Sequence, residues 1–326
     1  KGKERIEKLK STVKEIKQKS KGNKYDCLIG MSGGIDSSYL AYLVTELGLR
    51  PLALHMDNGW NSKEAVKNIK NVCAKLNIDY SSHVLDWNEF KDIQLSFLKS
   101  SIVEVEIPTD TAISGTLYRM AAKHNIKYII SGCNLASEGI LPKKWFYDPN
   151  DKRLFMSIQK IFGKEKIKNF PFFDYKRQFY YKFFRGIKMV YILNLYDYDK
   201  ENAKKILNEK LDYTDHGGKH HESVYTRFVQ SYVQPVKFNL DYRRATYSSL
   251  ICSGFITRKE ALKILENSPY EIDQIEKDIA YVSKKFGITE DAFKAILNKP
   301  AKSYKDYKNN ESFLTMIYTI YRAIFN

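Results

Sequence analysis

The chain has 326 residues, of which 43% are hydrophobic, and 54 Lys and Arg against 38 Asp and Glu give a formal net charge of +16. This composition excludes a disordered chain, and no uncharged apolar run reaches the about 18 residues of a membrane span. The positive charge favours a nucleotide, a nucleotide-sugar, RNA or an anionic membrane as partner, or it reflects codon bias alone, so it selects no substrate.

The chain begins with an amphipathic helix and continues with alternating strands and helices. Ile6, Leu9, Val13 and Ile16 recur at spacings of three and four within residues 1–24. Strands are then expected at 25–31, 51–56, 80–85 and 127–130, and helices at 36–47, 62–76, 87–99 and 111–124. A fifth strand is expected at 188–193, with a helix from 199 onward.

This alternation predicts an α/β fold with a parallel sheet covered on both faces. We assign residues 25–210 to this domain and treat the aromatic and basic stretch at about 135–187 as an insertion without clear elements. Its aromatic side chains are expected mostly to pack, with one or two rings stacking on a sugar or base. Residues 211–326 are predicted to form a mostly helical region that contacts substrate or a partner.

The four cysteines indicate neither a zinc site nor a disulfide framework. Cys27 falls in a strand-like run and Cys73 in a helix-like run, so both are predicted to be core residues. The other two cysteines are Cys133 and Cys252, and no two of the four form a C-x-x-C pair. A reducing cytoplasm is the expected location, since no signal-peptide pattern is present. The first residue is Lys rather than Met, so we expect the chain to be part of a longer gene product.

The stretch Ser32-Gly33-Gly34-Ile35-Asp36-Ser37 lies between the first strand and the following helix. Ligands of open parallel sheets bind beyond the carboxyl ends of the strands. The two glycines let backbone N–H groups approach an anion, and the serine hydroxyls and the helix N-terminus add donors. A Walker A loop has a Lys after its second glycine, and none follows here. The stretch therefore predicts a phosphate site that is not a kinase P-loop.

This S-G-G-x-D-S stretch resembles the PP-loop of the N-type ATP pyrophosphatases, whose fold is adenine nucleotide alpha hydrolase-like and Rossmann-like. The resemblance implies that ATP is cleaved to AMP and pyrophosphate with adenylation of a substrate oxygen. Mg²⁺ neutralises the pyrophosphate, with Asp36 as its ligand or orienter. The implied nucleotide contacts are Ser32, Gly33, Gly34, Asp36, Ser37, Ser38, His55, Asp57, Ser131 and Gly132. For His55, a structural role is equally consistent with the sequence.

Four further motifs resemble the N-acetyl sugar amidotransferases, the WbpG/PseA-like enzymes of surface-polysaccharide and nonulosonic-acid pathways. The motifs span 57–62, 131–142 with Trp145 just beyond, 217–223 and 241–251. This family usually starts with a short Cys-rich segment, so any zinc site is expected upstream of Lys1. Cys133 stands where the family often has Gly.

The second resemblance implies a specific reaction. The acetamido oxygen of an N-acetyl sugar is adenylated, ammonia adds to the carbon, and loss of AMP leaves an acetamidino sugar for lipopolysaccharide O-antigen or for pseudaminic-acid-type flagellin glycans. Candidate acid–base residues are Glu138, His220 and Glu222, beside Asp36. Candidate substrate-binding residues are Asn134, Trp145, Lys219, Arg227, Arg243 and Arg244. Glu138 is equally consistent with a helix cap, and Arg243 and Arg244 with a solvated helix face.

No cysteine lies in a G-x-C-x-G elbow, so the sequence contains no glutaminase site. The resemblance implies that ammonia comes from a separate, HisH-like glutaminase subunit, with a HisF-like subunit as a further partner. Nucleic acid is not an expected partner.

Two alternatives remain. A PP-loop tRNA-modifying enzyme of the thiolase type would share the ATP site and use the positive charge. Such thiolation commonly needs paired cysteines, and Cys133 is the only one near the predicted site. A non-enzymatic nucleotide sensor would not need the polar motifs of the C-terminal half.

Overall fold

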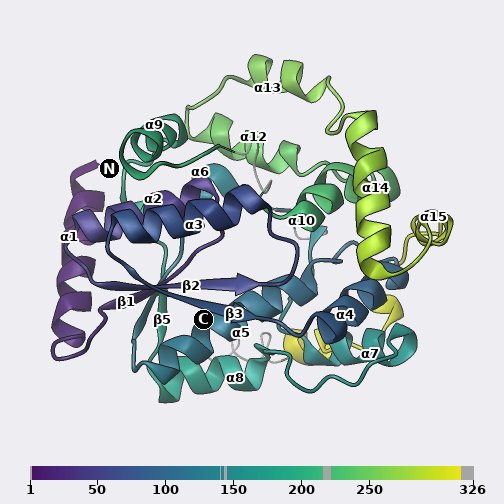
Figure 1. The fold of residues 1–326 in the computed structure, drawn as a ribbon, viewed down its shortest axis with the longest axis horizontal. Helices are drawn as coiled ribbons and strands as arrows, with labels where there is room; N and C mark the ends of the chain where they lie inside the picture. The colour runs from purple at the N-terminus through teal and green to yellow at the C-terminus, as the bar shows by residue number, and fades with distance from the viewer. Residues whose placement is uncertain (1, 140, 143–144, 216–221, 317–326) are drawn as a thin grey trace.

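The computed structural model describes residues 2–139, 141–142, 145–215 and 222–316 (Figure 1). Five parallel strands form one sheet in the order β3-β2-β1-β4-β5. Their bounds are β1 Cys27–Gly30, β2 Pro51–Asp57, β3 Asp79–Val84, β4 Tyr128–Ile130 and β5 Lys188–Val190. The strand order reverses at β1, since β2 pairs with one of its edges and β4 with the other. The carboxyl end of β1 is therefore a topological switch point, where ligands of such sheets bind.

Helices cover both faces of the sheet, as the alternation predicts. Ile29, Ala53 and Ile130 face a core formed with helices on one side, and Leu28, Leu54 and Ile129 face a second core on the other. The first core includes residues of α1 (Gly2–Lys19), α2 (Ile35–Glu46), α3 (Lys63–Lys75) and α9 (Lys200–Leu211), and the second includes residues of α5 (Ile107–Lys123).

Local capping explains where several helices begin. The Ser62 hydroxyl accepts a hydrogen bond from the backbone of Ala65 at the start of α3, and Asp86 caps α4 (Trp87–Ser100) in the same way. Helix α5 begins at Ile107, four residues before the predicted Thr111, because Pro108 is accommodated in its first turn.

The strand predicted over 188–193 is shorter than expected. Strand β5 ends at Val190, and Ile192–Leu195 form a 3₁₀ helix. The side chains of Ile192 and Leu193 are still buried, so the apolar run reflects core packing rather than strand length.

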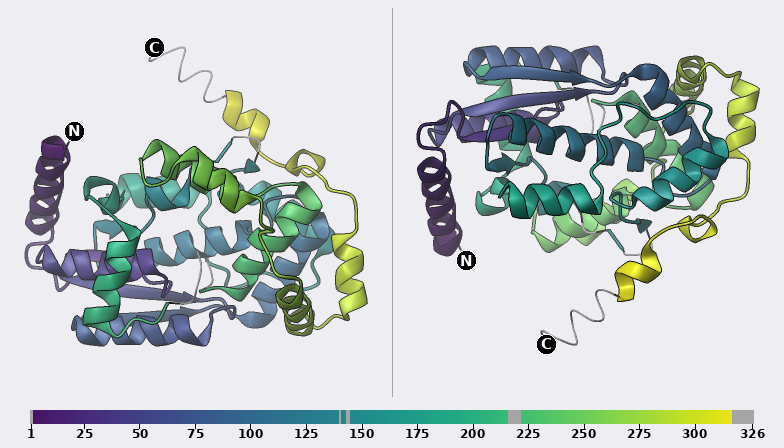
Figure 2. Two further views of the ribbon diagram at one scale, coloured as in Figure 1. Left: turned by 90° about the horizontal axis from the view of Figure 1, so that it is seen from above. Right: turned by 90° about the horizontal axis from the view of Figure 1, so that it is seen from below.

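The N-terminal helix α1 lies at one end of the molecule, and α14 (Ile272–Phe286) and α15 (Glu290–Leu297) lie at the other (Figures 1 and 2). Leu9, Val13 and Ile16 of the predicted stripe are buried, whereas Ile6 is 52% exposed. No helix in the described part of the chain combines the length and apolar character needed to cross a membrane.

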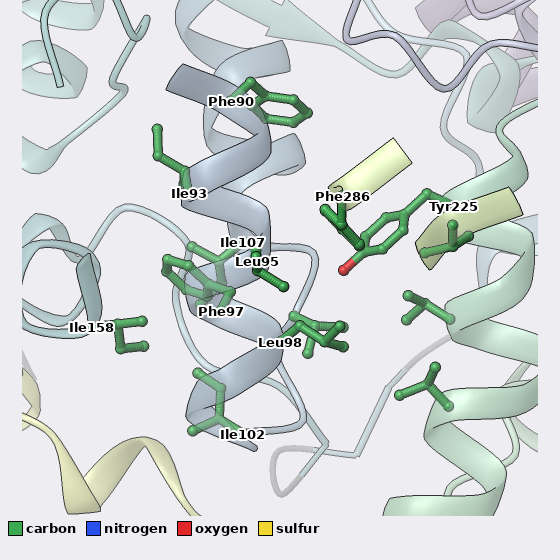
Figure 3. Packing of buried hydrophobic residues seen from close by; sticks show 14 of the residues in the cluster. Phe90, Ile93, Leu95, Phe97, Leu98, Ile102, Ile107, Ile158, Tyr225 and Phe286 are labelled. Carbon is green, nitrogen blue, oxygen red and sulfur yellow. The ribbon is translucent and has the colours of Figure 1, made fainter. Parts of the chain in front are cut away.

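The insertion and the C-terminal half are helical and share one core with α4. Phe90, Ile93 and Phe97 of α4 contribute to this cluster together with Tyr225 and Phe286 (Figure 3). The helical elements of the insertion are α6 Leu135–Glu138, α7 Lys152–Phe162, α8 Tyr175–Phe179 and a π-helical turn at Tyr180–Phe184. The C-terminal half contributes α10 Val224–Phe228, a π-helical turn at Val229–Val233, α11 Gln234–Phe238, α12 Arg243–Cys252, α13 Arg258–Leu265, α14 Ile272–Phe286 and α15 Glu290–Leu297.

Candidate active site

The loop after β1 is held in shape by its own hydroxyl groups. The Oγ atoms of Ser32 and Ser37 lie 3.1 Å apart, and Ser37 Oγ donates to the carbonyl oxygen of Gly34 at 3.1 Å. The backbone N–H of Gly34 donates to Ser32 Oγ at 3.3 Å. Helix α2 begins directly after this loop, so its positive N-terminal end lies beside these hydroxyls.

Two glycines let neighbouring backbones approach the loop closely. Gly33 has φ +84°, and a Cβ there would lie 2.4 Å from the carbonyl oxygen of Ala65 in α3. A Cβ on Gly132 would lie 3.3 Å from the backbone of Asp36. The loop after β4 therefore lies against the first turn of α2, as the positions of the two strands predict. The cradle of glycines, hydroxyls and helix N-terminus fits a polyphosphate.

Asp36 lies in the first turn of α2, where its carboxylate accepts a hydrogen bond from the hydroxyl of Tyr198. Burial and the charge of Asp36 raise the pKa of Tyr198, so this hydroxyl remains a donor at neutral pH. One carboxylate beside a polyphosphate suits Mg²⁺, which is usually held by one or two carboxylates together with substrate phosphates and water. Within the described residues, no group of three or more His, Cys, Asp or Glu side chains forms a separate metal site.

His55 is a positioning residue rather than the nucleotide contact named from the sequence. It is 4% exposed, with Nδ1 2.8 Å from the carbonyl oxygen of Met31 and Nε2 3.2 Å from Nδ2 of Asn61. Both ring nitrogens therefore have protein partners, and the ring ties the end of β2 to the residue before the loop. Asp57 accepts from Gly59 N at 2.8 Å and from Asn61 Nδ2 at 3.0 Å, which shapes the turn after β2.

Two other predicted contact residues are buried behind the site. Ser38 is fully buried, and its hydroxyl has no hydrogen-bond partner among the described residues, so it does not reach the loop surface as expected. Asn134 is 4% exposed, and its Nδ2 donates to the carbonyl oxygen of Gly132 at 3.3 Å. This contact supports the loop after β4.

The C-terminal half reaches the loop through residues 222–224. Ser62 N donates to the carbonyl oxygen of Glu222 at 2.9 Å, and Val224 N donates to that of Trp60 at 3.0 Å. The carboxylate of Glu222 lies against Gly34, since a Cβ on that glycine would be 3.2 Å from Glu222 Oε1. The predicted acid–base residue Glu222 is therefore brought to the loop, whereas the predicted Lys219 and His220 lie outside the described residues.

Two of the three predicted anion-binding arginines are occupied by carboxylates. Arg227 pairs with the buried Asp278 at 2.6 Å. Arg243 Nε donates to Asp241 Oδ1 at 3.0 Å, and its Nη2 donates to Asp241 Oδ2 at 2.7 Å and to the carbonyl oxygen of Asn267 at 3.0 Å. Their guanidinium groups are paired within the C-terminal half, and the phosphate or sugar contact predicted for them stays a prediction.

The other two predicted substrate contacts are placed differently. Arg244 is exposed at the start of α12. The Trp145 ring lies 6.1 Å from that of Tyr242, so it packs on the C-terminal half.

An acidic cluster between α4 and the C-terminal helices was missed from the sequence. Burial raises the pKa of Glu104 to about 7 and that of Glu106 to about 8. Burial, together with the charge of Glu138, raises the pKa of Asp110 to about 7, although part of its surface is exposed. The feature of the sequence that could have indicated this cluster is three acidic residues within seven positions, in a stretch that is otherwise mostly apolar.

The cluster makes stability depend on pH. The pKa of Glu106 is about 8 in the folded protein and close to the ordinary 4.5 in the unfolded chain. As pH rises between these values, the unfolded chain loses this proton first, so the free energy of unfolding falls. Glu106→Gln is therefore expected to match the wild type near about pH 5 and to be more stable near about pH 8, by up to a few kcal/mol.

Denaturant unfolding at a series of pH values measures this difference. Glu209→Gln, an exposed change on α9, is the matched control and should follow the wild-type curve. Parallel curves for Glu106→Gln and the wild type would show that Glu106 is not desolvated in the fold.

Comparisons with known proteins match the two halves of the chain separately. Residues 5–132 match the family model of NAD synthase. Residues 222–322 match the family described as LPS biosynthesis protein WbpG-like, C-terminal domain. The parallel sheet, the loop after β1 and the NAD synthase match define a PP-loop protein, a class of ATP-using enzymes. The C-terminal residues 222–322 are similar to the WbpG-like C-terminal domain, and the two matches together support a WbpG-like PP-loop protein.

Individual relatives are more distant. The uncharacterized protein MJ1599 of Methanocaldococcus jannaschii is 31% identical over 136 residues, which cover 40% of this chain and 47% of that protein. The tRNA-specific 2-thiouridylase MnmA 2 of Fusobacterium nucleatum is 26% identical over 214 residues, covering 56% of this chain and 58% of the relative. The chain thus spans about half the length of these relatives.

Among solved structures, the NH3-dependent NAD synthetase of Campylobacter jejuni has 20% identity and a TM-score of 0.32, over 64% of this chain and 84% of that one.

Proposed function

We propose that this protein is an ATP-dependent amidotransferase that converts the acetamido group of an N-acetyl sugar into an acetamidino group. The observation that carries the proposal is the contact of Glu222 with Gly34. This contact brings the first residue of the WbpG-like segment against the ATP loop. A residue of the WbpG-like segment therefore lies beside the loop at which we propose that ATP is cleaved.

The chemistry follows from the weak electrophilicity of an amide carbonyl. Attack of the acetamido oxygen on the α-phosphorus of ATP releases pyrophosphate and leaves an imidate whose oxygen carries AMP. Ammonia then adds to the carbon, the C–O bond to AMP breaks, and the nitrogen loses a proton to give the amidine. The loop after β1 would hold the phosphates, and Mg²⁺, bound beside Asp36, would neutralise their charge.

Glu222 is suited to accept the proton that the attacking nitrogen loses, since its carboxylate lies at the loop. Glu138 follows the loop after β4 in α6 and is the second candidate. Ammonia would come from a separate, HisH-like glutaminase, with a HisF-like partner. The product would serve the synthesis of surface polysaccharide or of nonulosonic-acid glycans.

Mass spectrometry of nucleotide-linked N-acetyl sugars incubated with ATP and ammonium chloride tests this reaction. The expected product has the acetamido oxygen replaced by an N–H group, with one AMP and one pyrophosphate released for each conversion. Glu222→Gln is expected to slow product formation about a hundredfold, because it removes the proton acceptor. Glu64→Gln, an exposed change on nearby α3, should leave the rate unchanged.

The rival reaction is adenylation of a tRNA base before sulfur transfer, which the thiouridylase relative favours. Cys133 is exposed beside the loop after β4 and is the cysteine such a reaction would use. ATP-dependent modification of tRNA that is lost in Cys133→Ser, together with the absence of any modified sugar, would replace the proposed function by this one.

A further inference from the structure

The partly buried Glu104 and Glu106 and the exposed Asp110, which form the acidic cluster, lie against the WbpG-like helices. Thr226 of α10 donates to Glu106 Oε2 at 2.8 Å. The charge of Glu106 contributes to raising the pKa of the neighbouring Tyr225 hydroxyl, and all three carboxylates contribute to raising that of Tyr242. The cluster therefore lies where the loop between α4 and α5 meets the C-terminal half.

Several polar atoms around the cluster lack a hydrogen-bond partner among the described residues. They are Glu104 Oε2, Glu106 Oε1, the Tyr225 hydroxyl and Gln234 Oε1. Tyr225 is 1% exposed and Gln234 is 4% exposed, so bulk water does not supply the missing partners. Figure 3 shows the Tyr225 hydroxyl pointing into the packed interior, toward the side on which α4 and Ile107 lie. Unpaired buried groups of this kind are costly unless a ligand completes them.

The unpaired atoms indicate the chemistry of that ligand. Two carboxyl oxygens and one amide oxygen are acceptors, and a tyrosine hydroxyl can accept as well as donate. The neighbouring cation Arg227 is paired with Asp278 through Nη2, while its Nε and Asp278 Oδ2 lack partners among the described residues. A small cation with several N–H donors matches this set, whereas an anion would be repelled.

Hydrogen bonds connect the cluster to Ser223, which is next in the chain to a residue at the ATP loop. Thr226 Oγ1, which donates to Glu106, lies 3.0 Å from Ser223 Oγ. Ser223 directly follows Glu222, whose carboxylate lies against Gly34. The hydroxyl groups of Thr226 and Ser223 therefore lie between a ligand held at Glu106 and the chain segment that reaches the phosphate loop.

We propose that Glu104, Glu106, Tyr225 and Gln234 form the site that receives ammonium and passes ammonia to the adenylated acetamido group. This inference rests on the proposed function and names the entry site of its nitrogen substrate. Ammonium itself is not a nucleophile, because its nitrogen has no lone pair. The site must therefore both bind it and take one proton from it.

Glu106 can do both. Its ionised carboxylate binds ammonium, one N–H bond breaks and an O–H bond forms, and neutral ammonia and the carboxylic acid remain. The pKa of Glu106 is raised to about 8. Its carboxylate is therefore a stronger base than an ordinary carboxylate, and its basicity is closer to that of ammonia. The titratable groups that face it are Glu104, Asp110, Tyr225 and Tyr242, with Glu138 next to Asp110.

Ammonium binding can be measured without any sugar. The full chain is melted in ammonium chloride and in sodium and potassium chloride at equal ionic strength, and tryptophan fluorescence is recorded in parallel. Trp60 stacks on Tyr225 with ring centres 5.0 Å apart, so it reports on the site. A saturable response to ammonium alone is expected, weakened at least about tenfold in Glu106→Gln and unchanged in Glu209→Gln.

Kinetics give the second measurement. Glu106→Gln is expected to raise the KM for ammonia about tenfold, a larger change than in the KM for ATP. If the Glu106→Gln protein does not fold, Tyr225→Phe, which removes one unpaired hydroxyl, should also raise the KM for ammonia, by a smaller factor. Equal responses to all three salts, or an unchanged KM for ammonia in both variants, would overturn the site. Ammonium binding that is lost in Glu106→Gln, in an enzyme that modifies no sugar, would support the site and refute sugar amidation instead.

Discussion

Replacing Asp36 with asparagine is expected to lower ATP-dependent release of pyrophosphate at least about a hundredfold. The carboxylate is placed in the first turn of α2, beside the hydroxyls that would hold the phosphates. Asparagine keeps the shape of the side chain and an oxygen that can accept from Tyr198, so the melting temperature should change little. A pyrophosphate-release assay and a thermal melt on the same preparation separate these effects. Ser32→Ala, which removes one hydroxyl of the loop, should also abolish most of the release.

Tyr198→Phe is the control for Asp36→Asn. It removes the hydroxyl that donates to Asp36 but leaves the negative charge in place. Its loss of activity should be clearly smaller than that of Asp36→Asn. If instead Asp36→Asn retained the wild-type rate of AMP formation, the loop would not be the site of ATP cleavage.

Local sequence patterns were sufficient to predict the sheet and the loop after β1. The strands near Cys27 and Pro51 are short apolar runs, and the helices α3, α4 and α5 each start at a capping residue or a proline. The Ser32–Ser37 stretch is likewise contiguous, so its residues must lie together wherever the chain folds. Such features depend on neighbours in sequence, and a single sequence contains them completely.

The acidic cluster depends on contacts that sequence order hides. Glu106 is desolvated because Thr226 and Tyr225, about 120 positions away, pack over it. In the sequence it is simply one of three acidic residues, a pattern that usually marks a solvated surface. The unpaired oxygens follow from this packing and have no local signature.

The arginines also have contacts that sequence order hides. Arg227 has the chemistry of an anion-binding residue, but its partner Asp278 is 51 positions away and buried. The carboxylate partner of Arg243 can be found in the sequence, since Asp241 lies only two residues before it. A basic side chain is therefore best treated as substrate-binding only when no acidic residue lies near it on the same turn.

Trp60 packs the turn after β2 against the C-terminal half of the chain. It is fully buried, its ring stacks on Tyr225 of α10, and its Nε1 donates to Gln94 of α4. The ammonium group of Lys285 in α14 lies 4.7 Å from the Trp60 ring centre and donates to the carbonyl oxygen of Gly59. The turn after β2, which belongs to the nucleotide side, is thus packed directly against the WbpG-like helices.

The two glycines of the loop should respond very differently to alanine. Gly33→Ala places a methyl group 2.4 Å from the carbonyl oxygen of Ala65, at φ +84°, and both the backbone obstacle and the positive φ are fixed. A loss of about 2–4 kcal/mol in the free energy of unfolding is expected, with ATP-dependent pyrophosphate release nearly abolished. Calorimetry and the pyrophosphate assay measure the two effects.

Gly34→Ala is the matched change one residue later. Gly34 has φ −79° and ψ 169°, which any residue adopts, and the nearest atom to a new Cβ is Glu222 Oε1 at 3.2 Å. Because that atom ends a flexible side chain, stability should fall by less than about 1 kcal/mol. The displaced carboxylate should nevertheless slow amidation of the sugar more than it slows pyrophosphate release. Equal effects of Gly34→Ala on both steps would show that Glu222 acts in the cleavage of ATP. No effect on either step would remove Glu222 from the mechanism, and with it the contact on which the proposed function depends.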